Sequence, residues 1–129
     1  MRDIRSKATL AASINPATYN SAQTGTGVDL SGYDAAMAIV QVGAITDGTH
    51  TPKLQESVDN VTFTDVAATD IVLGKSGNAL AAASANAVQC VGYIGAQRYI
   101  RVYVTSSGAT GAVYGAMISL GKPNQAPTA

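Results

Sequence analysis

The stretch from Gln89 to Val104 constrains the fold more than any other part of this chain. It reads QCVGYIGAQRYIRVYV, two runs rich in β-branched and aromatic residues around a glycine-bearing turn at residues 95–97. Two such runs with a short interruption are typical of antiparallel strands joined by a turn. We therefore predict a central hairpin made of residues 88–94 and residues 98–105.

The second strand of this hairpin divides its side chains between two faces. Successive side chains of a strand point to opposite sides, so Ile100, Val102 and Val104 are expected in the core. The opposite face carries two tyrosines and an arginine, with a second arginine just before the strand. Tyrosine and arginine are enriched at interface hot spots. The candidate partner-binding residues are therefore Arg98, Tyr99, Arg101 and Tyr103.

Further strand patterns follow one another along the chain, separated by turn residues. A hairpin is predicted around Asp59 and Asn60, with Phe63 and Val66 as core candidates. The segment 36–42 is apolar almost throughout, which predicts burial on both faces. Residues 78–87 are rich in alanine and fit either a short helix or a loop. The other predicted strands cover residues 9–14, which end at Asn15 and Pro16, residues 28–30 and residues 112–120.

About eight short strands at this spacing predict an all-β fold, an antiparallel β-sandwich of jelly-roll type. The 129 residues fit one domain. We expect a flexible basic N-terminal arm at residues 1–8, a single β-sandwich domain at residues 9–120, and an extended C-terminal tail at residues 121–129.

The charge pattern bears on which partners the chain binds. Eight basic residues balance eight acidic ones, which argues against nucleic acid and against an anionic membrane. No apolar stretch is long enough for a transmembrane helix. Basic and aromatic side chains on one strand can stack on nucleic-acid bases, but the rest of the chain is not basic. Low charge favours self-association or docking onto a larger assembly.

The residues that most often carry catalysis are scarce. The single cysteine, Cys90, lies in an apolar run and is expected to be a buried hydrophobe. The single histidine, His50, lies beside a turn and is expected to be exposed. A Cys90–His50 nucleophile pair would be needed for a small hydrolase. With one residue of each kind, no Cys/His zinc motif can form. We expect no enzyme activity, no metal and no cofactor.

Four segments together resemble a known protein family. They read DLSGYD at residues 29–34, IVQVGAITDGTHTPKLQES at residues 39–57, DNVTFTDV at residues 59–66, and VGYIGAQRYIRV at residues 91–102. They are similar to head-associated proteins of tailed bacteriophages and prophages, of the decoration or cement type. The likeness extends over about residues 28–123. The family more often has Asp-Gly at the turn where this chain has Asp59-Asn60, and Asn also tolerates the left-handed backbone.

This resemblance implies a non-enzymatic virion protein on the capsid surface, assembled in the host cytoplasm. Its implied partners are the major capsid protein, whose subunits it would bridge, and itself, as a dimer or trimer. Two alternatives remain open at this stage: a tail- or fibre-associated phage protein, and a carbohydrate-binding β-sandwich module. The second lacks the tryptophan platforms that sugar sites commonly offer, since the chain has no Trp.

Overall fold

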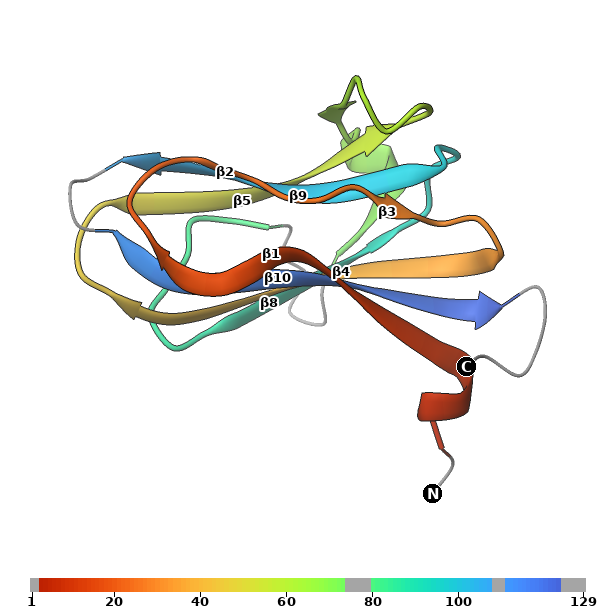
Figure 1. The fold of residues 1–129 in the computed structure, drawn as a ribbon, viewed down its shortest axis with the longest axis horizontal. Helices are drawn as coiled ribbons and strands as arrows, with labels where there is room; N and C mark the ends of the chain where they lie inside the picture. The colour runs from red at the N-terminus through yellow and green to blue at the C-terminus, as the bar shows by residue number, and fades with distance from the viewer. Residues whose placement is uncertain (1–2, 74–79, 108–110, 124–129) are drawn as a thin grey trace.

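Two antiparallel sheets pack face to face in the computed structural model, which describes residues 3–73, 80–107 and 111–123. Figure 1 shows them as two layers, with β1, β10, β4 and β8 in one and β2, β9 and β5 in the other. The strands are β1 (Ala8–Tyr19), β2 (Gln23–Thr24), β3 (Val28–Asp29), β4 (Tyr33–Ile45), β5 (Thr49–Ser57), β6 (Thr64–Asp65), β7 (Ile71–Val72), β8 (Val88–Tyr93), β9 (Tyr99–Ser107) and β10 (Ala112–Pro123). Single turns of 3-10 helix lie at η1 (Arg5–Lys7) and η2 (Ala68–Asp70).

The strand order is that of a jelly roll. Sheet A has the order β1-β10-β4-β8-β7, and sheet B has the order β2-β9-β5-β6, with β3 also paired to β9. The pairs are nested like one long folded hairpin: β1 with β10, β2 and β3 with β9, β4 with β8, and β5 with β6. Wrapping that hairpin into two layers gives the jelly roll. The predicted fold class is confirmed.

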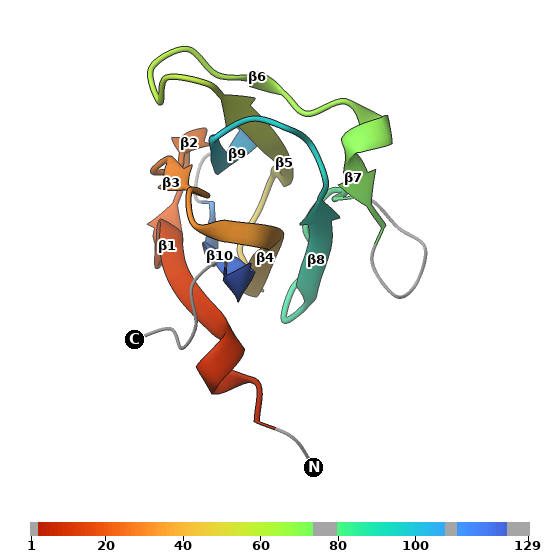
Figure 2. The same ribbon diagram turned by 90° about the vertical axis from the view of Figure 1, so that its right-hand side faces the viewer.

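The core lies between the two sheets and is built from alternating positions of the long strands. Figure 2 views the sandwich along its strands and shows β5 and β9 across from β4 and β10. The inward positions are apolar, as half-buried strands require. The most deeply buried of them are Ala38, Val40, Val91, Ile100, Val102, Val104, Ala112, Tyr114 and Ile118. Val66 is buried as predicted, whereas Phe63 is only half-buried.

The predicted central hairpin is wrong in its pairing. β8 pairs with β4 and β7 in sheet A, while β9 pairs with β5, β2 and β3 in sheet B. Both strands present an apolar row to the same core from opposite sides, so the chain between them must cross from one sheet to the other. At this crossover Ile94 donates a backbone hydrogen bond to Asp70, and Arg98 accepts one from Leu30.

Three other sequence predictions need correction. The first strand does not stop at Asn15 and Pro16: β1 continues past them to Tyr19, through register shifts between Ala12 and Ala17. Proline is tolerated there because β1 is a sheet edge, where a missing N–H costs no ladder bond. The arm contains η1, and β1 already begins at Ala8. At the other end, β10 runs to Pro123, past the expected start of the tail. Residues 124–129 lie outside the described residues.

The strand over residues 36–42 is also buried differently from the prediction. Ala38, Val40 and Val42 are buried, but Met37 and Gln41 on the other side of the strand are exposed. The apolar run therefore faces the core on one side only. The alanine-rich segment is a loop where the structure describes it, over residues 80–87, and Ala83 donates a backbone hydrogen bond to His50.

Candidate partner-binding surface

The outer face of sheet B carries three of the four predicted partner-binding residues. Tyr99, Arg101 and Tyr103 are half-buried, and they alternate along β9 with fully buried apolar residues. The predicted division of this strand into two faces is therefore confirmed. Arg98 lies one residue before β9 and is exposed. A rigid sheet thus positions two aromatic rings and one guanidinium on the same surface.

Arg101 is held in place by two side chains. Its Nε donates to the Gln55 side-chain oxygen at 2.9 Å, and its guanidinium carbon lies 3.9 Å from the centroid of the Phe63 ring. Burial among these groups lowers the pKa of Arg101, because desolvation disfavours its charged form. Because Gln55 is itself buried, its hydrogen bond restricts the rotamers of Arg101 and holds the guanidinium in one orientation.

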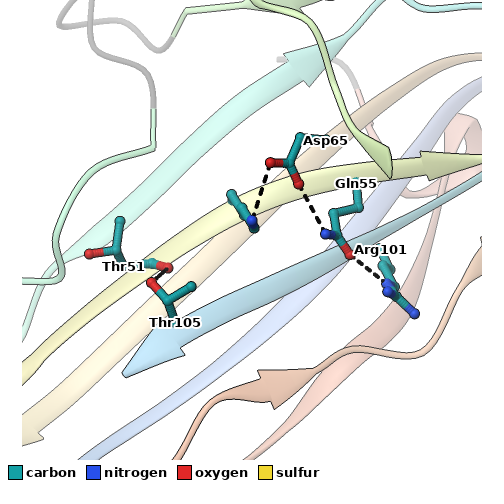
Figure 3. Close-up of polar contacts among 6 residues, drawn as sticks. Thr51, Gln55, Asp65, Arg101 and Thr105 are labelled. Carbon is teal, nitrogen blue, oxygen red and sulfur yellow. Dashed lines mark hydrogen bonds and ion pairs between the residues drawn. The ribbon is translucent and has the colours of Figure 1, made fainter. Parts of the chain in front are cut away.

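The hydrogen bonds continue from Gln55 toward β6. The Gln55 Nε2 donates to Asp65 Oδ1 at 3.0 Å, and Lys53 Nζ donates to Asp65 Oδ2 at 3.2 Å. Figure 3 shows Arg101, Gln55 and Asp65 in a line across the strands. The amide of Gln55, followed by the Lys53 ammonium, lowers the pKa of Asp65. Lys53 also lies 5.2 Å from the Tyr103 ring, so this face is ordered by its own side chains.

Arg101 and Arg98 differ in whether they have a carboxylate partner. Two ion pairs occur among the described residues, Lys53 with Asp65 and Arg98 with Asp29. Arg101 has no carboxylate partner in that part of the chain. An oriented guanidinium of this kind binds a carboxylate through two parallel hydrogen bonds, with more geometric specificity than an ammonium. Arg101 is therefore the residue best prepared to bind an acidic side chain of another molecule.

Arg98 has a structural contact instead. Its Nε and Nη2 each donate to the Asp29 carboxylate at 2.9 Å, which joins the start of β9 to β3. Asp29 also accepts from the Ser31 backbone N–H at 2.9 Å. The Arg98 hydrogen bonds, followed by that of Ser31, lower the pKa of Asp29. With its charge balanced locally, Arg98 is less available to a partner than Arg101.

The outer face of sheet A is a second exposed surface, and sequence reasoning missed it. Its side chains form rows across four strands, such as Ala12, Met117, Ile39 and Cys90. The neighbouring rows contain Leu10, Ser119, Met37 and Gly92, and then Gly115, Gln41 and Val88. We call these three rows, together with Pro16, Gly43 and Val113, the apolar face.

The apolar face includes no charged residue. A groove of about 550 Å³ runs along it where small residues meet larger ones, with Leu10, Pro16, Val88 and Met117 among its walls. The sequence did contain a signal. The alternate positions of β1, β4, β8 and β10 that form these rows carry no charge in the sequence, which is uncommon for a solvated sheet face.

The two residues considered for nucleophilic chemistry do not meet. His50 is buried rather than exposed, and its ring contacts the Ser106 hydroxyl through Nδ1 at 2.9 Å and the Asp47 carbonyl through Nε2 at 3.0 Å. Cys90 is not in the core but half-buried on the outer face of sheet A. They occupy different sheets, so the structure does not form the pair. Among the described residues, no cluster of three His, Cys, Asp or Glu side chains could hold a metal ion.

Comparisons with known proteins bear on the fold. No family model matches this sequence, and no curated protein matches it either. The crystal structure of the SPBc2 prophage-derived protein YomS is similar, with a TM-score of 0.58 and 17% sequence identity. The match covers 88% of this chain and 92% of that one, so the two share the sandwich over nearly their whole lengths. None of the helices in the described part of this chain is long and apolar enough to cross a membrane.

Proposed function

We propose that this chain is a structural protein of a tailed-bacteriophage particle, which binds the outside of the capsid and stabilises it by bridging major capsid subunits. The observation that carries the phage origin is the fold likeness to a prophage-derived protein over 88% of the chain. The resemblance of four sequence segments to decoration proteins supports the finer assignment to the capsid surface. In this role the protein needs exposed binding surfaces and no covalent chemistry.

The outer face of sheet B is the proposed capsid contact. Arg101 would bind a carboxylate on the shell, and Tyr99 and Tyr103 on either side would supply apolar contact area with few rotatable bonds. The Phe63 ring and Gln55 hold the guanidinium before binding, so little side-chain entropy is lost on attachment. Arg98 and Asp29 would keep the start of β9 in place beside this contact.

Shell symmetry gives the proposed role its strength. One copy attached through a small face binds only weakly. A copy that contacts two capsid subunits turns the second contact into an intramolecular event, which raises the effective affinity without new chemistry. Many equivalent copies would then stabilise the expanded shell together.

Co-sedimentation with expanded capsids that lack this protein tests the proposal. Saturable binding at a fixed ratio to the major capsid protein, with capsids that resist heat better, is the expected result. Binding should weaken as salt rises, because an arginine–carboxylate contact at the surface is screened. Absence of binding to heads would overturn the capsid role, and binding to purified tails would replace it with the tail-associated alternative.

A further inference from the structure

The apolar face on the outside of sheet A has no covering element in the described part of the chain. Leu10 is 63% exposed and Val88 62%, and Met37 and Val113 are 37% and 39% exposed. Monomeric proteins rarely leave a contiguous apolar patch of more than a few hundred Å² in water. The face is therefore a strong candidate for contact with another molecule.

The size of this face matches what a specific interface needs. The three rows, together with Pro16, Gly43 and Val113, cover roughly 450 Å² of flat area at about 4.8 Å between strands and about 6.8 Å between rows. The side chains standing on the sheet make its accessible area larger. Two such faces together bury roughly 1,000 Å² or more, the size at which an interface is specific.

The chemistry of this face fits a second copy better than a charged partner. It has no charged side chain to pair with an acidic or basic surface, and none to repel an identical surface. The whole chain has a formal net charge of +0, so two copies do not repel at long range either. Two-fold association places the same surface of both copies in contact, and an uncharged surface allows this without repulsion.

The shape of the apolar face also allows it to pack against the same face of a second copy. Gly115 and Gly43 lie low along the groove, where the nearest atoms to an added Cβ would be those of Pro16 and Val113. Leu10 and Val88 stand on either side of it. Under a two-fold axis the raised side chains of one copy meet the groove of the other, at the spacing of about 10 Å that stacked sheets adopt.

We propose that the apolar face of sheet A is the surface through which two copies of this chain pack face to face. This inference does not rest on the capsid role, because it concerns the purified chain alone. It leaves the Arg101 face of each copy pointing outward on opposite sides of the dimer.

Sedimentation equilibrium over a range of concentrations tests the proposal. The wild-type chain is expected to be dimeric. Leu10→Lys and Val88→Lys, which come from different strands, should each weaken dimerisation by at least about tenfold, because each buries an unpaired charge. Val61→Lys is the matched control, since Val61 is 79% exposed and lies outside this face. It should dimerise like the wild type, and thermal unfolding should show that all three variants are folded.

Cys90 provides a second readout, because it lies in the middle row of the face. Dimerisation should slow its alkylation by a neutral reagent as protein concentration rises, and Val88→Lys should move this protection to at least about tenfold higher concentration. A wild-type chain that stays monomeric would overturn the proposal. Protection of Cys90 that does not depend on protein concentration would also overturn it, because the chain's own residues would then cover the face. The proposal would fail as well if the Val61→Lys control dissociated as much as Leu10→Lys and Val88→Lys.

Discussion

The hydroxyl of Tyr93 in sheet A donates a 2.6 Å hydrogen bond to the carboxylate of Glu56 in sheet B. The same oxygen accepts the backbone N–H of Gln97 at 3.0 Å. One buried side chain therefore links β8, β5 and the crossover between the sheets. This contact closes one end of the sandwich, beside the start of the strand that carries Arg101.

Replacing Tyr93 with phenylalanine should destabilise the domain. The ring would still fill its place, but the Glu56 carboxylate and the Gln97 N–H would lose their partner. Hydrogen bonds to charged groups contribute about 1.5–3 kcal/mol, and we expect a loss of that order in the free energy of unfolding. Urea denaturation measures it. Tyr19→Phe is a suitable comparison, because the Tyr19 hydroxyl donates to the Asn15 carbonyl within its own strand and does not link the two sheets. An unchanged midpoint for Tyr93→Phe would show that the link between the sheets contributes nothing.

Tyr93 should also make stability sensitive to alkaline pH. Burial, and then the hydrogen bond to Glu56, raises the pKa of Tyr93 from 10.0 to about 12. A pKa raised in the folded state gives stability that is complete below pH 10 and lost as pH rises toward 12. Thermal unfolding measured across this window should show the fall. The Tyr93→Phe variant should show a smaller one, and identical pH profiles for the two proteins would contradict this assignment.

Gly95 is expected to resist substitution by alanine. A Cβ at this position would lie 2.5 Å from the Tyr93 hydroxyl oxygen and 2.6 Å from its ring. Overpacking of this kind typically costs about 1–3 kcal/mol. Gly121→Ala is the matched control, because its Cβ would meet nothing closer than 3.8 Å. In a Tyr93→Ala background the cost of Gly95→Ala should nearly vanish, and a double-mutant cycle of unfolding free energies would measure that coupling.

Arg101→Gln should weaken capsid attachment while leaving the domain folded. The substitution removes the charge that has no carboxylate partner among the described residues but keeps a polar side chain on β9. We expect a loss of at least about tenfold in apparent affinity in the co-sedimentation assay. Thr46→Glu changes the net charge by the same amount from an exposed position near the other end of β5, and it should bind like the wild type. Equal binding by Arg101→Gln would remove this face from the proposed contact.

Sequence reasoning was right about which face each residue of β9 occupies and wrong about which strand lies beside it. Period-2 alternation fixes sidedness, because each backbone step turns the side chain over. It carries no information on pairing: a short link such as residues 95–97 can turn within one sheet or cross to the other. Asn60 was predicted to lie in a turn and to tolerate a left-handed backbone, and its φ of 61° agrees. This prediction depends only on local sequence.

The error over residues 36–42 has a different origin. The pattern was rightly identified as apolar on both sides, and burial was inferred from it. Met37 and Gln41 are nevertheless exposed. A sequence shows that the side chains on one side of a strand are apolar, but it does not show whether other residues of the same chain bury them. Where the two sides of a strand are both apolar and only one is buried, as in β4, the structure is needed to show which side is exposed.

The pairing of β1 with β10 governs how this domain can be made. Ala8 of β1 pairs with Gly121 of β10, so the first strand of this sandwich gains its neighbour in sheet A only when the last strand has been synthesised. Until then its apolar residues, including Ile14, have no sheet to join. Contacts this distant in sequence slow folding and leave strand edges open to other chains. The domain is therefore completed only after translation of β10.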